Sequence, residues 1–234
     1  MKKIVFLIVE SSIETIPKEL LNDPLIKKEA LKRKKKTSEI ILDVSKHYKP
    51  MQRHKIQNID KRGRPDIIHR SLITILDSLL TKSIQTEIYI HTLKDEIIKV
   101  SPETRIPRNY NRFIGLFEQL FKHKKVPSNS PKALIEVSNK RVEEIFSDIR
   151  TKSGLIIGFS RKGKRLKNSL NYFREHLQKE ELIAYVVGGF PIGFFSEKIL
   201  KNLDEIISLG PFSLTTSATL CRIITINEIL LGII

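Results

Sequence analysis

The sequence of 234 residues contains a single cysteine, Cys221, so no intramolecular disulfide can form. It has no run of about 20 apolar residues of the kind that crosses a bilayer. The apolar block near the N-terminus covers only Ile4–Val9, which is too short for a cleavable secretion signal. These absences exclude disulfide-framework and membrane-spanning proteins. They predict a soluble protein without a membrane partner, cytoplasmic or, in a eukaryote, nucleolar.

Several catalytic motifs are also missing. The sequence has no GxSxG nucleophile elbow, no phosphate-binding Walker loop, no HExxH zinc motif and no GxGxxG dinucleotide fingerprint. His54, His69 and His91 have no metal-ligand spacing with Cys221. We therefore predict no metal site, and we interpret His69 as a packing or capping histidine rather than a base.

Acidic residues are scarce relative to basic ones. Lys and Arg number 42 against 26 Asp and Glu, which gives a net charge of +16. Residues 27–70 carry a net +10, residues 105–125 a net +5, and residues 161–167 hold five basic residues without an acid. Such clustered charge is typical of proteins that bind a phosphate backbone. An anionic membrane surface or simple solvation by lysine are alternatives, but arginine, concentrated in two of the stretches, favours nucleic acid.

Short apolar blocks alternate with helical patterns along the chain, which predicts an α/β fold with a largely parallel sheet. The expected strands are Lys3–Val9, Glu87–His91, Leu155–Phe159, Ile183–Val187 and Glu205–Leu209. The expected helices are Pro65–Lys82, Pro107–Lys122, Lys167–Lys179, Glu197–Leu203 and Thr216–Leu231.

A basic segment at about residues 27–64 interrupts this alternation. Leu31–Lys36 is a charge run that we expect to be mobile and solvated. Lys46–Asp60 shows little periodicity and reads as a basic loop. We therefore expect one domain over residues 1–234 with an irregular insertion at 27–64.

The segment Lys61–Leu72, KRGRPDIIHRSL, places two guanidinium groups directly ahead of a helix. Pro65 suits the first helical position, and the free N–H groups of a helix start favour anions. Asp66 is close enough to hold the Arg64 guanidinium in a fixed orientation. The alternative is an ordinary helix start with an Arg–Asp pair.

A second segment, TRIPRNYNRFIGLFEQL, carries arginines spaced by three and four residues: Arg105, Arg108 and Arg112. If a helix starts at Pro107, then Arg108 and Arg112 share one of its faces. Such a row matches repeated phosphates, and Tyr110 could stack on an unpaired base. Phe113 fits the apolar stripe of the helix, so we assign it to the core. The alternative is a solvated helix face.

Two glycine-containing turns follow predicted strands in the C-terminal third. GGFPIG begins at Gly188, and LGPFSL covers Leu209–Leu214. Glycines at a strand end permit close approach of the backbone to a ligand. Because ligands bind at the carboxyl ends of parallel strands, the two turns predict a site for a small ligand.

The ordered set RGRPDIIHRSL, TRIPRNYNRFIGL, GGFPIG and SLGPFSLTTSATLCRI resembles the SPOUT-class ribosome-biogenesis methyltransferases, over the whole chain. The resemblance implies methylation of N1 of a pseudouridine in small-subunit rRNA, with S-adenosylmethionine as cofactor. It also implies a homodimeric α/β knot fold with a C-terminal trefoil knot. Rival interpretations are a non-catalytic rRNA-binding assembly factor and a SPOUT methyltransferase that acts on tRNA.

Motif by motif, the resemblance implies roles for individual residues. Relatives often have an acidic residue where this chain has Phe194, so the polar partner of the cofactor is open. A carboxylate paired with arginine is a weak base, so we expect Asp66 to orient Arg64 rather than to remove a proton. The implied cofactor-binding residues are Ile157, Gly188, Gly193, Leu209, Gly210, Pro211, Phe212, Ser213 and Leu214; the implied RNA-binding residues are Arg64, Arg105, Arg108 and Arg112; the implied catalytic pair is Arg64 and Asp66.

Overall fold

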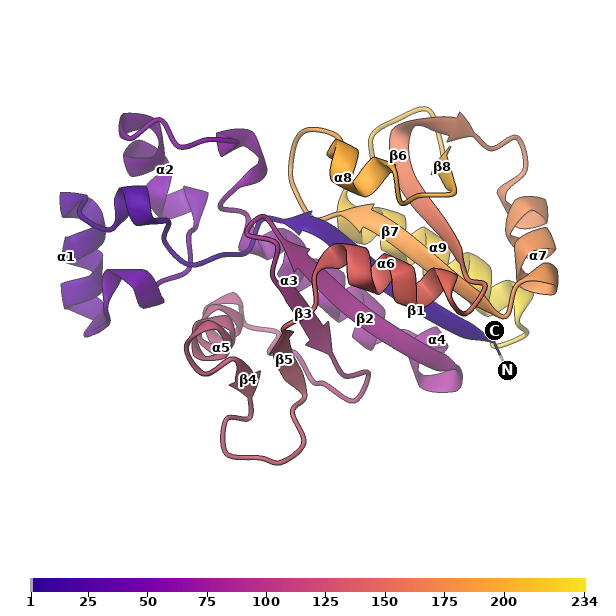
Figure 1. The fold of residues 1–234 in the computed structure, drawn as a ribbon, viewed down its shortest axis with the longest axis horizontal. Helices are drawn as coiled ribbons and strands as arrows, with labels where there is room; N and C mark the ends of the chain where they lie inside the picture. Colours follow the sequence, from indigo (N-terminus) through magenta and orange to yellow (C-terminus); the bar gives the residue numbers. More distant parts are fainter. Residues whose placement is uncertain (1) are drawn as a thin grey trace.

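The computed structural model describes residues 2–234 and has a central sheet covered by helices on both faces (Figure 1). In the described chain the sheet has eight strands in the order β4-β5-β3-β2-β1-β7-β6-β8. The strands are β1 (Lys3–Ser11), β2 (Gln85–Thr92), β3 (Ile97–Val100), β4 (Lys125–Val126), β5 (Ile135–Ser138), β6 (Leu155–Arg165), β7 (Leu182–Gly188) and β8 (Glu205–Ser208).

The parallel part of the sheet consists of β2, β1, β7, β6 and β8, which are the five strands expected from the sequence. The other three strands, β3, β4 and β5, pair antiparallel at one edge. These strands were not expected from the sequence; each has only two to four residues.

Strand β1 lies in the middle of the sheet, and both of its faces are buried. Ile4, Phe6 and Ile8 belong to one core cluster, whereas Val5 and Leu7 belong to the cluster on the opposite face. Each of these side chains is at most 1% exposed. This double burial explains why the strand is a continuous apolar run rather than an alternating one.

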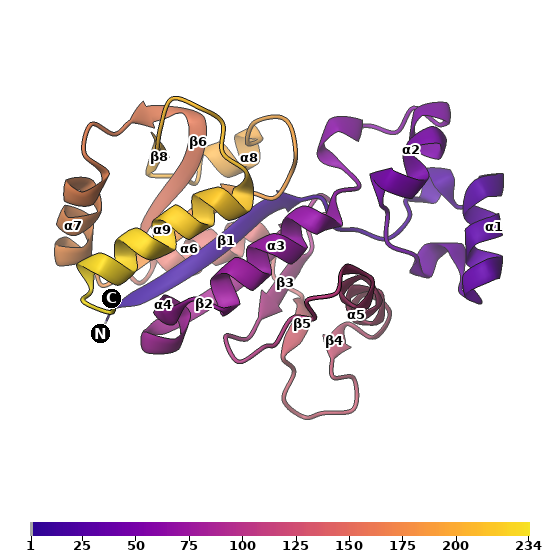
Figure 2. The ribbon, with the colours of Figure 1, turned by 180° about the vertical axis from the view of Figure 1, so that it is seen from behind.

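Helices cover the two faces unequally, as Figures 1 and 2 show from opposite sides. On one face lie α3 (Pro65–Leu76), α4 (Leu79–Ser83), α5 (Tyr110–His123), α7 (Ser169–Lys179) and α9 (Thr216–Leu230). On the other face lie α6 (Val142–Arg150) and α8 (Glu197–Leu200).

Two of the expected helices have different bounds. The helix expected over Pro65–Lys82 is divided at Ser78, whose side chain accepts a hydrogen bond from the N–H of Thr81 and starts α4. The helix expected at Pro107 begins at Tyr110, because the side chain of Asn109 caps it.

The basic segment at 27–64 was predicted to be irregular, and this prediction is wrong. Together with the residues that precede it, the segment forms α1 (Pro24–Arg33) and α2 (Val44–Arg53), with short 3-10 turns at Lys18–Leu20, Thr37–Glu39 and Ile59–Lys61. These elements enclose a small core that includes Ile26, Leu42 and Met51. We call residues 15–61 the helical insertion; in both views it projects from one end of the sheet.

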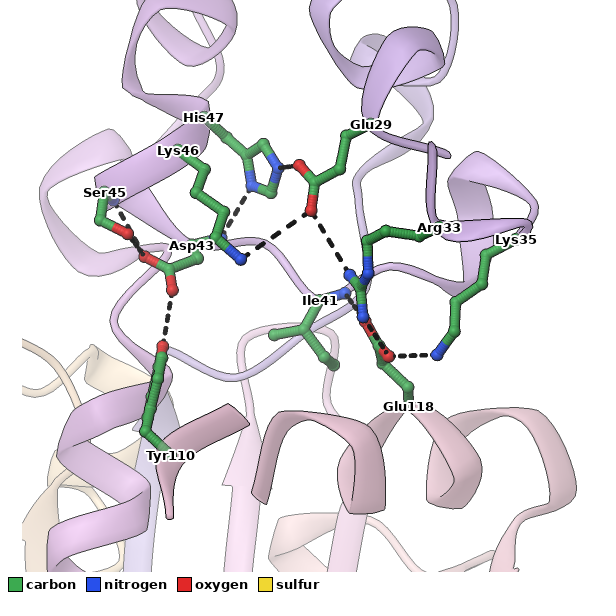
Figure 3. Close-up of polar contacts among 10 residues, drawn as sticks. All are labelled: Glu29, Arg33, Lys35, Ile41, Asp43, Ser45, Lys46, His47, Tyr110 and Glu118. Carbon is green, nitrogen blue, oxygen red and sulfur yellow. Dashed lines mark hydrogen bonds and ion pairs between the residues drawn. The ribbon is translucent and has the colours of Figure 1, made fainter. Parts of the chain in front are cut away.

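Polar contacts attach the helical insertion to α5 (Figure 3). The buried carboxylate of Glu118 on α5 accepts a hydrogen bond from Nη2 of Arg33 at 2.8 Å and also pairs with Lys35. Its other oxygen lies 3.4 Å from the N–H of Ile41. The run Leu31–Lys36 was therefore wrongly predicted to be a free, solvated segment, because two of its cations serve this buried carboxylate.

A second contact of the same kind lies at the start of α5. The hydroxyl of Tyr110 donates a hydrogen bond of 2.6 Å to Asp43 of the helical insertion (Figure 3). Burial raises the pKa of the Asp43 carboxyl, but hydrogen bonds from Ser45 and Tyr110 outweigh burial and hold the pKa below its usual value. A third contact is the ion pair of Lys122 on α5 with Glu39 of the insertion at 3.1 Å, so the insertion and α5 are joined at three points.

We expect Glu118→Ala to lower the free energy of unfolding by about 2 kcal/mol, because it leaves Arg33 and Lys35 without their buried partner. Urea unfolding followed by circular dichroism measures this difference. The exposed neighbour Gln119→Ala is the matched control and should change little. An equal effect of the two substitutions would contradict the role given to Glu118.

Candidate active site

A cavity of about 500 Å³ opens at the carboxyl ends of the parallel strands. Because β1, β7, β6 and β8 run parallel and lie side by side, the turns that follow them meet at one edge of the sheet. The residues predicted from the two glycine turns that line it are Gly188, Gly193, Leu209, Gly210, Phe212, Ser213 and Leu214. Arg64 lines the same cavity, although it lies more than 120 residues earlier in the chain.

The turn after β7 is held by the end of the helical insertion. Nζ of Lys61 donates to the carbonyl oxygen of Phe194 at 2.6 Å and to Glu10 at 2.7 Å. It also lies 4.3 Å from the ring centroid of Phe190. Gly193 has a φ of +126°, and a Cβ there would lie 2.9 Å from the Lys61 side chain. The backbone thus requires glycine here, and a larger side chain would also displace Lys61.

Glu10 receives Lys61 through an irregularity at the end of β1. The pairing register between β1 and β2 shifts between Ile8 and Ser11, and Glu10 has a φ of 51°, which is uncommon outside glycine. Its N–H donates to Nδ1 of His91, and Nε2 of His91 contacts Asp95 at 2.9 Å. Burial lowers the pKa of His91, which keeps the ring neutral and able to accept this bond.

The other carboxylate oxygen of Glu10 accepts a hydrogen bond from the N–H of Ser196 at 3.1 Å. Glu10 is only 6% exposed, so its carboxylate binds groups of the protein rather than solvent. Phe194, where the resemblance led us to expect an acid, lines the cavity, and its carbonyl oxygen accepts the hydrogen bond from Lys61. The carboxylate at the base of this turn therefore comes from β1.

The turn after β8 leaves space for a ligand. A Cβ added at Gly210 would meet no atom within 4 Å, and Phe212 is 79% exposed. Thr216, at the start of α9, donates a hydrogen bond of 2.7 Å to the carbonyl of Gly188 and so joins the two turns. Hydroxyl groups of Ser213 and Thr219 also line the cavity.

Arg64 and Asp66 form a two-point ion pair, as predicted. Nε and Nη2 of Arg64 donate to the two carboxylate oxygens of Asp66 at 2.7 and 2.8 Å. These bonds raise the pKa of Arg64, so its guanidinium stays charged. Pro65 begins α3 and Asp66 lies in its first turn, so the pair is fixed to a helix end.

The neighbouring Arg62 has a different position. It forms two hydrogen bonds of 2.6 Å with Glu14, whose side chain is 1% exposed. Between the arginines, Gly63 has a φ of +69°, and a Cβ there would lie 3.1 Å from the N atom of Val44. Of the two guanidinium groups before α3, only that of Arg64 reaches the cavity.

The arginines of the second segment lie beside α3. Nε2 of His69 donates to the carbonyl of Pro107 at 2.7 Å, and the His69 ring stacks on Phe113. Both His69 and Phe113 are therefore packing residues, as predicted. The segment that leads into α5 is thereby held against the helix that begins beside Arg64.

All three arginines of this segment are exposed. Arg108 lies outside α5 and pairs with Asp77 at 2.7 Å, so the prediction that it shares a helix face with Arg112 is wrong. In the described chain Arg105 and Arg112 have no ion-pair partner. The Tyr110 hydroxyl is committed to Asp43.

Two predicted cofactor residues do not line the cavity. Ile157 is completely buried in the main core, because β6 continues before it reaches the edge; Phe159 and Ser160 line the cavity instead. Pro211 lies at the tip of the second turn, between two lining residues. Residues 2–234 contain no group of three or more His, Cys, Asp or Glu that could hold a metal ion. Across the same range, no helix has the length and apolar character needed to cross a membrane.

Several residues at the cavity were not predicted from the sequence. Lys61 and Glu10 carried no motif of their own, since their roles depend on contacts between distant parts of the chain. Arg161 and Lys162 were noted only as part of a basic stretch, yet both line the cavity. A charge run immediately after a predicted strand was the one available signal for them.

Known proteins resemble this chain over nearly its whole length. The model of the EMG1/NEP1 methyltransferase family matches residues 6–228. The chain is 39% identical over 226 residues to the ribosomal RNA small subunit methyltransferase Nep1 of Saccharolobus solfataricus, covering 97% of each chain. It is 40% identical to the protein of that name from Staphylothermus marinus, covering 97% of this chain and 96% of the relative.

A solved structure is similar as well. The crystal structure of Archaeoglobus fulgidus Nep1 bound to S-adenosylhomocysteine superimposes with a TM-score of 0.85 at 34% identity. The match covers 99% of this chain and all of the other. The chain therefore belongs to the EMG1/NEP1 methyltransferase family.

Proposed function

We propose that this protein uses S-adenosylmethionine to methylate N1 of a pseudouridine in small-subunit rRNA during ribosome biogenesis. This proposal rests on one observation: residues of both glycine turns and Arg64 line the same cavity. A site for a methyl donor and a positively charged site for an RNA base are thereby adjacent. The relatives named as rRNA methyltransferases support the same reaction.

The cavity fits S-adenosylmethionine by size and by character. A volume of about 500 Å³ lies in the range of small-molecule sites. Phe159, Phe190 and Phe194 give it apolar walls, and Gly210 leaves room for close approach. We infer that the turns 188–193 and 209–214 hold the cofactor, with Pro211 and the buried Ile157 as supports rather than contacts.

The chemistry required of the protein is mainly positioning. When bound, S-adenosylmethionine supplies a methyl group already activated by its sulfonium. Pseudouridine is joined to ribose through carbon, so its N1 carries a hydrogen that must leave. We infer that Arg64 stabilises negative charge on the base while water accepts the N1 proton. Asp66 is then a positioning residue that fixes Arg64.

RNA binding extends from Arg64 along the start of α5. The exposed Arg105, Arg108 and Arg112 lie on the segment held against α3, and Arg105 and Arg112 have free guanidinium groups in the described chain. Arginines in such a row suit successive phosphates. The Asp77 partner of Arg108 is half exposed and can be displaced by a phosphate.

We further propose a homodimer, a C-terminal trefoil knot, and action in the cytoplasm, or in the nucleolus of a eukaryote. Ile192 and Phe212 are 67% and 79% exposed, which supports a covering partner next to the cavity. Ile229 and Ile234 are also at least half exposed. The single domain predicted over residues 1–234 fits a sheet that runs through the chain from β1 to β8.

The direct test is methyl transfer to a short rRNA hairpin that contains pseudouridine, read by nucleoside mass spectrometry. We expect one methyl group per pseudouridine and none on the same hairpin with uridine, whose N1 is bonded to ribose. Equal methylation of uridine would contradict the specificity. RNA binding without cofactor binding would support a non-catalytic assembly factor, and preference for a tRNA would support that alternative substrate.

Asp66→Asn should lower the methyl-transfer rate by about 100-fold, because Arg64 loses its charged partner and its fixed orientation. Single-turnover rates measure this loss, and a crystal structure of the variant should show a displaced Arg64. Asp60→Asn, at an exposed position nearby, is the matched control. Normal RNA binding and an unmoved Arg64 together with lost catalysis would instead make Asp66 a general base.

Lys61→Met should weaken binding of S-adenosylhomocysteine about tenfold, since the turn after β7 loses its attachment to Glu10. Isothermal calorimetry measures the affinity. Lys49→Met, on an exposed face of α2, makes the same chemical change away from the cavity. To separate the buried Glu10 charge from the turn, Lys61→Met is repeated with Glu10→Gln. Unchanged affinity in both variants would contradict the role of Lys61.

A further inference from the structure

Strand β6 contains a four-residue bulge where it passes the cavity. Phe159 and Lys164 both pair with Ile207 of β8, so Ser160–Gly163 leave the ladder between them. A Cβ at Gly163 would lie 2.6 Å from the carbonyl oxygen of Ile206, which no other residue could tolerate. The bulge is therefore a fixed feature of the backbone, because Gly163 packs closely against β8.

The bulge borders the cavity from the side away from the helical insertion. Ser160, Arg161 and Lys162 all line the cavity. In the sheet, β7 separates β6 from β1, and the insertion follows β1. Figure 1 shows the end of β6 curving away above the sheet, distant from the insertion. The cavity is thus lined by Arg64 on one side and by the pair Arg161 and Lys162 on another.

The bulge and the residues after it form a patch of uncompensated charge, which we call the β6 basic tip. Every basic residue in it is exposed, and residues 159–168 contain no acid. In the described part of the chain, none of these cations has an ion-pair partner; the nearest contact is Lys162, 5.1 Å from the ring centroid of Phe194. The members are Arg161, Lys162, Lys164, Arg165 and Lys167.

This patch differs from the helical insertion, which contains most of the longest basic stretch of the sequence. In the insertion, Arg33 and Arg53 are paired with buried carboxylates, as is Arg62 directly after it, and these arginines so contribute to folding. The β6 basic tip has no such internal use, and its like charges repel one another. An external polyanion is the partner that would favour them.

We propose that the β6 basic tip binds phosphates of the substrate RNA, so that the target nucleotide is held between this tip and Arg64. The inference rests on the proposed function and adds a second RNA surface to it. A rival role is binding of the cofactor carboxylate by Arg161 or Lys162. That role needs one cation, whereas Lys164, Arg165 and Lys167 lie outside the cavity lining.

The test variant is Lys164→Ala/Arg165→Ala, which removes two charges without touching the cavity lining. Fluorescence anisotropy of the pseudouridine hairpin is measured between 50 and 200 mM salt. We expect affinity to fall about tenfold, and the slope of log K against log salt to decrease by about 1.4 to 1.8, with S-adenosylhomocysteine affinity unchanged. Arg161→Ala/Lys162→Ala should decrease the slope by a similar amount.

The matched control is Lys152→Ala/Lys179→Ala. Both lysines are exposed and precede β6 and β7, so they lie at the opposite edge of the sheet. This control makes the same change in net charge and should leave the salt slope close to that of the wild type. A decrease as large as that of the test variant would show that only net charge matters and would overturn the proposal.

Other results separate this inference from the proposed function. If the wild type methylates the hairpin but the test variant keeps its affinity and salt slope, the β6 basic tip is not an RNA surface. If Arg161→Ala/Lys162→Ala weakens cofactor binding alone, the carboxylate role replaces it. A wild type that binds no RNA would overturn both.

Discussion

The ammonium group of Lys61 joins three parts of the chain on which the cavity depends. It connects the end of the helical insertion to Glu10 at the end of β1 and to the carbonyl of Phe194 in the turn after β7. Because Glu10 is buried, removal of Lys61 would leave an uncompensated charge in the interior, which costs more than breaking an exposed pair. The position of the insertion and the shape of the turn after β7 are therefore coupled through one side chain.

The site could be predicted where its chemistry is local in sequence. The Arg64–Asp66 pair spans two positions, and the turns at 188–193 and 209–214 follow strands that their apolar runs reveal. Lys61 could not be predicted, since its partners lie 51 positions earlier and 133 positions later. The predicted start of α5 was wrong for a local reason: the helix begins after its cap, Asn109, and not at Pro107.

Clustered positive charge in the sequence does not all remain available to a partner in the folded protein. The most basic stretch of the sequence, residues 27–70, uses several of its cations to satisfy buried carboxylates such as Glu14 and Glu118. The sequence pattern did not predict its polar helices, because only a few side chains, such as Ile26 and Met51, form their core. Arg161 and Lys162, by contrast, stay unpaired and line the cavity, where an anionic substrate would reach them.

If one cavity serves both the methyl donor and the target base, a crystal structure of the protein with S-adenosylhomocysteine and a pseudouridine hairpin will show both molecules there. We expect S-adenosylhomocysteine between the turns 188–193 and 209–214, with the target base in contact with Arg64. A cofactor product bound elsewhere, or a target base remote from Arg64, would contradict a shared cavity.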